Sequence, residues 1–67
     1  MNIEEILDEL IEKKEQDLNI FMEAYANLPL HIYESIEGLS FSKTKKESGK
    51  KAKLITKAFH DNFTINN

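Results

Sequence analysis

The chain has 67 residues, and this length allows one small domain at most. It contains no cysteine, which excludes disulfides and thiolate metal sites, and no apolar run approaches the roughly 20 residues of a membrane span. The N-terminus is acidic where a signal peptide would be basic, so we expect a cytoplasmic protein without membrane contact. Because a core of this size gives little net stability, we also expect association with a second copy or a target.

Charge is sorted along the chain. Residues 1–39 carry ten acidic residues and two lysines, a net charge of −8, whereas residues 40–67 carry seven lysines and two acidic residues, a net charge of +5. The total of −3 therefore hides a strong asymmetry, which points to charged partners.

The first predicted element is a long helix from about residue 3 to 27. Its apolar residues form one broad stripe on a helical wheel, Asn2 fits the N-cap with Glu5 three residues later, and Pro29 ends the segment. The opposite side of this helix is acidic; its members are Glu5, Asp8, Glu9, Glu12, Glu15 and Glu23.

Lys14 interrupts the apolar stripe of this helix. Three alternatives fit: the side chain snorkels to solvent, it sets the register of a self-associated helix, or the helix bends between Lys13 and Asp17. The start of the helix also lacks aromatic residues, so we expect it to reach beyond the core and pair with a second copy. The residues predicted for this self-association are Ile3, Ile6, Leu7, Leu10, Ile11 and Lys14.

A short second helix is predicted from about residue 29 to 37. Pro29 suits its first turn, and Gly38 occupies the position where a glycine commonly follows a helix C-terminus. A basic third helix should then start at about residue 43 or 49, with Ser42, Thr44 or Ser48 as candidate caps, and run to residue 63. Residues 64–67 are expected to fray.

The third helix has an apolar and a basic side. Ala52, Ile55 and Phe59 share the apolar side, and the opposite side forms what we call the lysine face, made of Lys43, Lys46, Lys50, Lys53 and Lys57. Such a face is either solvated or contacts a phosphate backbone or an acidic protein. Since the acidic and basic sides both point away from their apolar stripes, we expect them not to pair within one chain.

Residues 32–44 resemble a DNA-binding helix-turn-helix motif, with Gly38-Leu39-Ser40 as the turn between two helices. The resemblance implies a nucleic-acid-binding regulator. Thr44 and Glu47 stand where the recognition helix of that family usually buries apolar residues.

Catalytic residues cannot be assembled from this sequence. His31 and His60 are the only histidines, and each has one acidic neighbour, too few ligands for a metal site. We expect both to be exposed at helix ends, and we predict no metal, no cofactor and no enzymatic activity.

Together these patterns predict a single all-α domain over residues 1–67, a helical hairpin or three-helix bundle that forms a dimer. The predicted core is Leu7, Leu10, Leu18, Phe21, Tyr25, Leu28, Tyr33, Ile36, Phe41, Ile55, Phe59 and Phe63. The predicted function is a small interaction or regulatory module that self-associates and binds a larger protein target. The alternative is a dimeric helix-turn-helix-like regulator that binds DNA or RNA through the lysine face.

Overall fold

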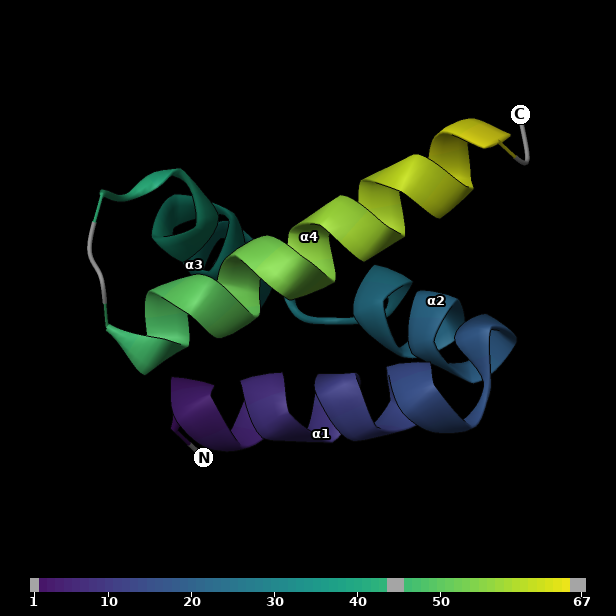
Figure 1. Cartoon of the computed structure of the whole chain (residues 1–67). Helices are drawn as coiled ribbons and strands as arrows, with labels where there is room; N and C mark the ends of the chain where they lie inside the picture. The colour runs from purple at the N-terminus through teal and green to yellow at the C-terminus, as the bar shows by residue number, and fades with distance from the viewer. Residues whose placement is uncertain (1, 44–45, 66–67) are drawn as a thin grey trace.

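The computed structural model describes residues 2–43 and 46–65, the last two by their backbone alone. These residues form a compact all-α bundle of four helices, α1 (Ile3–Gln16), α2 (Leu18–Ala26), α3 (Leu30–Phe41) and α4 (Glu47–Ile65) (Figure 1). The all-α prediction is confirmed, and one more helix is present than the sequence pattern indicated.

The predicted single helix over 3–27 is wrong, because Asp17 divides it. Asp17 is extended (φ −160°, ψ 117°); its N–H donates to the Lys13 carbonyl and its carboxylate accepts from the Asn19 N–H at 2.8 Å. One residue thus ends α1 and caps α2. A straight helix of this length would measure about 37 Å, whereas the longest extent of the molecule is 30 Å. The break lets α2 fold back against α1 (Figure 1).

The second helix is longer than predicted. It runs to Phe41, so Gly38 lies inside α3 with a negative φ instead of terminating the helix. Leu39, one residue further, packs against the core, and this contact favours continuing the helix past the glycine. Pro29 itself is the N-cap residue, and its carbonyl accepts from the Ile32 and Tyr33 N–H groups at 3.0 Å.

The third predicted helix corresponds to α4, which begins at Glu47, between the two predicted starts. The proposed cap Thr44 lies outside the described residues. The helix continues through Ile65, two residues beyond its predicted end at residue 63, and residues 66–67 of the predicted tail lie outside the described residues.

The core is assembled from all four helices. Its buried apolar residues are Ile6, Leu7, Leu10, Phe21, Tyr25, Ile36, Ala52, Ile55 and Phe59, with Leu28 and Tyr33 half-buried beside them. At its centre the Tyr25 ring stacks on Phe59 with ring centroids 4.2 Å apart, and Tyr33 meets Tyr25 edge-on at 5.2 Å. These contacts hold α2, α3 and α4 together.

Three predicted core residues are exposed instead: Leu18, Phe41 and Phe63. Leu18 is the first residue of α2 after the break. Phe41 follows Ile36 by five helical residues, which places it about 140° away around α3. Phe63 lies one turn beyond Phe59 near the end of α4, and its ring contacts Phe59 at a centroid distance of 6.0 Å.

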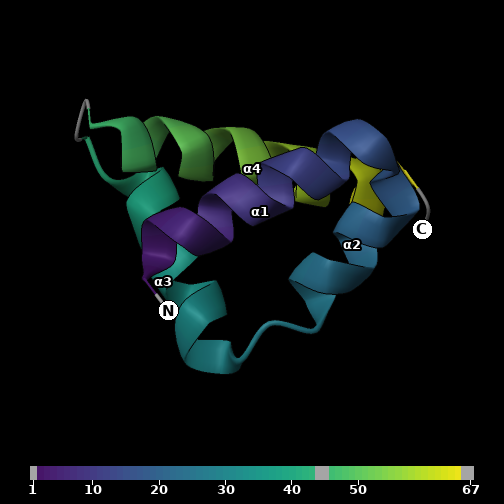
Figure 2. The same ribbon diagram turned by 90° about the horizontal axis from the view of Figure 1, so that it is seen from below.

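The helices do not contact one another equally. Helix α1 packs against α2 and α4, and α3 packs mainly against α4. Seen from below, α1 lies in front of α4, with α3 and α2 on either side of it (Figure 2). No described helix is both long and apolar enough to cross a membrane.

Candidate binding surfaces

An apolar groove opens between α1, α2 and the start of α3. Its volume is about 460 Å³. The apolar side chains that line it come from three segments: Ile6 and Leu10 of α1, Ala24 and Leu28 at the end of α2, and Pro29 and Ile32 at the start of α3. Figure 2 shows how α1, α2 and the start of α3, which supply these residues, are arranged. We refer to this feature as the groove.

The groove exists because the chain turns at residues 27–29 before α3 begins. The Asn27 N–H donates to the Glu23 carbonyl and the Leu28 N–H to the Tyr25 carbonyl, which closes the last turn of α2. Pro29 has no backbone N–H and disfavours helical geometry at Leu28, so α2 ends before it and the chain changes direction there. Helices α1 and α2 therefore pack against each other, whereas α3 runs away from them. The space between α1, the end of α2 and the start of α3 is apolar.

The rim of the groove is polar. Glu9 and Lys13 from α1 and His31 from α3 line it. Glu5 and Glu12 lie one helical turn before and after Glu9 on the exposed surface of α1. Acidic charge therefore outweighs basic charge along the α1 wall.

The apolar surface continues past the groove along α2. A second hollow is lined by Ile20, Glu23, Ala24 and Asn27, and Ala24 also lines the groove. Ile20 is 48% exposed and adds aliphatic surface to this hollow. The sequence pattern did not indicate this surface, because one continuous helix over residues 3–27 leaves no groove between its two halves.

The acidic and basic halves of the chain contact each other through an ion pair, contrary to the sequence expectation. Asp8 of α1 and Lys51 of α4 form an ion pair with Oδ1 and Nζ 2.6 Å apart. The hydrogen bond from Lys51 to Asp8 raises the pKa of the lysine above its usual value. Lys51 is half-buried and lies beside the lysine face, so it tethers α4 to α1.

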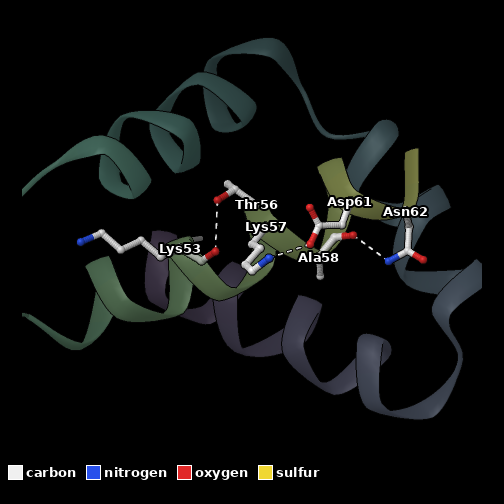
Figure 3. A network of polar contacts seen from close by, with 6 residues as sticks. All are labelled: Lys53, Thr56, Lys57, Ala58, Asp61 and Asn62. Carbon is white, nitrogen blue, oxygen red and sulfur yellow. Dashed lines mark hydrogen bonds and ion pairs between the residues drawn. The ribbon is translucent and has the colours of Figure 1, made fainter. Parts of the chain in front are cut away.

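The lysine face lies along the outer side of α4 and the segment before it. Lys43, Lys46, Lys50, Lys53 and Lys57 are all exposed. Lys57 forms an ion pair with Asp61 one turn later at 2.8 Å, which raises the pKa of Lys57, while the Lys53 side chain extends away from this pair (Figure 3). The Thr56 hydroxyl donates to the Lys53 carbonyl, and the Asn62 side-chain amide donates to the Ala58 carbonyl.

An exposed aromatic side chain lies next to this face. Phe41, at the end of α3, is 82% exposed and lines a shallow hollow of about 180 Å³ together with Lys53 and Lys57. Because the sequence pattern predicted Phe41 in the core, it did not indicate that Phe41 lies beside Lys53 and Lys57 on the surface.

The two histidines are both exposed, and they differ in their surroundings. His31 lies on the rim of the groove. His60 Nε2 lies 2.8 Å from Glu37 Oε1 of α3, a partner that the sequence spacing did not suggest. Glu37 also hydrogen-bonds Tyr33; burial and this bond raise the pKa of Tyr33. Within residues 2–43 and 46–65, no three acidic or histidine side chains converge on a metal position.

The predicted self-association residues belong largely to the core of one chain. Ile6, Leu7 and Leu10 are buried among α2, α3 and α4, and Ile3 and Ile11 pack against them, so the expectation that this segment reaches beyond the core is wrong. Lys14 is half-buried one turn before Asp17. Of the three alternatives given for Lys14, the structure shows the helix break, which falls at Asp17.

The predicted helix-turn-helix turn is wrong, since Gly38, Leu39 and Ser40 all lie within α3. The change of direction falls after Phe41, between α3 and α4. Compared with models of protein families, with curated proteins and with solved structures, the chain has no match.

Proposed function

We propose that this protein is a non-enzymatic protein–protein interaction module that binds a segment of a larger target in the groove. The observation that carries the proposal is the groove itself: an apolar hollow of about 460 Å³ with polar side chains only at its rim. Concave surfaces with a mostly apolar lining commonly mark binding or interaction sites.

The chemistry of the groove supports binding rather than catalysis. Its floor consists of aliphatic side chains, and the rim residues Glu9, Lys13 and His31 include no nucleophile paired with a base. The continuation over Ile20 and Ala24 supplies further apolar area for a partner. Aliphatic contacts across both hollows would provide affinity, and the charged rim would provide selectivity.

A helical-peptide library displayed on phage tests this proposal. Selected peptides should bind the wild type and lose about tenfold or more in affinity against Ala24→Phe, whose ring would fill the groove. The matched control is Ala26→Phe, because Ala26 is exposed on the same helix and lines neither hollow. Peptides that bind Ala24→Phe as tightly as the wild type, or a selection that yields no binder, would contradict the proposal.

Nucleic-acid binding through the lysine face is the second candidate, and the exposed Phe41 beside Lys53 and Lys57 favours it. An aromatic ring flanked by lysines suits stacking on bases of a single strand, with the lysines on its phosphates. The ion pair between Lys57 and Asp61 and the absence of arginine weaken this candidate.

A fluorescently labelled oligothymidine titration distinguishes the second candidate. Backbone contacts by three or four lysines predict affinity that falls steeply between about 50 and 200 mM salt, and Phe41→Ala should weaken binding at every salt concentration. Absence of binding at low salt would exclude it. Sedimentation equilibrium of the same sample measures whether the predicted homodimer forms.

A further inference from the structure

The residues that line the groove restrict which partners can bind in it. This inference rests on the function proposed above. The groove is lined by residues of α1, α2 and α3 and by Leu28 and Pro29 between α2 and α3, and the residues that the structure describes form helices and no strand. An extended peptide would find no free sheet edge to pair with and would bury its own polar backbone without partners. A helix satisfies its own backbone, so a helical segment fits these walls.

The size of the groove sets the length of contact. Along α1 its lining runs from Ile6 to Lys13, about two helical turns or roughly 10 Å. An amphipathic helix places aliphatic side chains at positions i and i+4 on one side over this distance. Two or three such side chains would cover Ile6, Leu10 and Ala24.

The charge around the groove selects the polar side of that helix. Glu9 lines the groove and Glu23 lines the adjoining hollow, and these residues lie on the two helices that form its long walls. Glu5 and Glu12 extend the acidic wall on α1, where the one opposing charge in the lining is Lys13. A basic helix would meet this surface with complementary charge, and an acidic helix would be repelled.

We propose that the groove binds a basic amphipathic helix of a partner protein, with aliphatic residues on the groove floor and lysine or arginine residues against Glu9 and Glu23. The acidic wall then steers association and the apolar floor holds the complex. Salt should therefore weaken the complex by slowing its formation more than by speeding its dissociation.

Two synthetic peptides test this directly on the full chain. Both have about four helical turns and the same leucines spaced i, i+4; one carries lysines on its polar side and the other glutamates. We expect the lysine peptide to bind about tenfold or more tightly than the glutamate peptide at about 50 mM salt. Glu9→Lys should reduce or reverse this preference, and Glu15→Lys, which changes the charge of α1 away from the groove, should change it little.

The outcomes separate this inference from the function on which it rests. Binding of both peptides with equal affinity, lost in Ala24→Phe, would overturn the basic-helix inference and leave the interaction module standing. Binding of neither peptide would overturn both. If the molecular weight of the wild type rises with protein concentration, and Glu9→Lys reduces that rise, the occupant of the groove is a second copy of this chain and not a partner helix. Circular dichroism of each variant shows that its helices are retained.

Discussion

Tyr25 stacks on Phe59 with ring centroids 4.2 Å apart and planes inclined by 18°, yet the Tyr25 hydroxyl is fully buried and has no hydrogen-bond partner among the described residues. A buried hydroxyl without a partner costs free energy that its ring contacts must offset. The residue that joins α2 to α4 is therefore also a local weakness of the core.

Removing that hydroxyl should stabilise the protein. For Tyr25→Phe we expect the free energy of unfolding to rise by about 1 kcal/mol, since the stack is kept and the unpaired oxygen is lost. Tyr33→Phe is the matched control, because the Tyr33 hydroxyl bonds to Glu37 and its removal should cost about 1 kcal/mol. Urea denaturation followed by circular dichroism measures both. A clear loss of stability in Tyr25→Phe would show that the hydroxyl is bonded.

Alkaline pH should unfold the protein for a related reason. Burial raises the pKa of Tyr25, and burial and the bond to Glu37 raise that of Tyr33, from an ordinary value of 10.0. Because the folded-state pKa values are raised, the protonated tyrosines stabilise the fold below pH 10, and this stability is lost as the pH rises above 10. The raised pKa of Lys51 acts with the same sign.

The spectroscopic signature of this unfolding is specific. Tyrosinate absorbance near 295 nm should increase together with the loss of helical circular dichroism, since Tyr25 ionises only when the core opens. Tyr25→Phe should move the alkaline midpoint upward. Ionisation of both tyrosines at about pH 10 with intact helices would contradict the burial argument.

The Asp17 side chain should contribute the stability of a helix N-cap. Asp17→Ala removes the carboxylate that accepts from the Asn19 N–H, and we expect a loss of about 1 kcal/mol in thermal or chemical unfolding. Glu15→Ala, two residues away on the surface of α1 and outside the break, should change stability by less than about 0.5 kcal/mol. Equal effects of the two changes would mean that the cap does not hold the break.

Gly38 offers a stabilising change. It lies inside α3, and an added Cβ would meet no described heavy atom within 4 Å outside the backbone of its own helix. Gly38→Ala should therefore raise the free energy of unfolding by about 0.5–1 kcal/mol through the lower entropy of the unfolded chain. If α3 ended at Gly38, as the sequence first suggested, alanine there would instead destabilise the protein.

Leu7 distinguishes a core residue from a residue of a dimer interface. Leu7 is completely buried in the single chain, so Leu7→Ala should cost about 2–5 kcal/mol at every protein concentration. Phe41→Ala should cost less than about 0.5 kcal/mol, because Phe41 is exposed. A Leu7→Ala effect that depends on protein concentration would restore the interface interpretation.

The sequence patterns predicted individual helices better than the packing between them. The Asn2 cap, the end of α2 before Pro29 and the apolar side of α4 over Ala52, Ile55 and Phe59 follow from local patterns, and the structure confirms them. The break at Asp17 was one of three alternatives, because Lys13 and Lys14 sustain helix on propensity and only the pairing of α1 with α2 decides the outcome.

The groove could not be predicted from local patterns at all. Ile6, Ala24 and Ile32 lie on three different helices, and the hollow among them depends on the break at Asp17 and the turn at Pro29 together. Phe41 was misplaced because the predicted second helix ended at residue 37, whereas α3 continues to Phe41 and places this side chain about 140° around the helix from the buried Ile36.

The last helix supplies Ala52, Ile55 and Phe59 to a core whose other members come from the three earlier helices. During synthesis the apolar sides of α1, α2 and α3 cannot be fully buried until α4 has been made. Tyr25 has no stacking partner until Phe59 has left the ribosome. The domain is therefore expected to fold as a unit only after α4 has been synthesised. During this interval the unfolded N-terminal half carries a large negative charge, and its self-repulsion would keep nascent copies from aggregating.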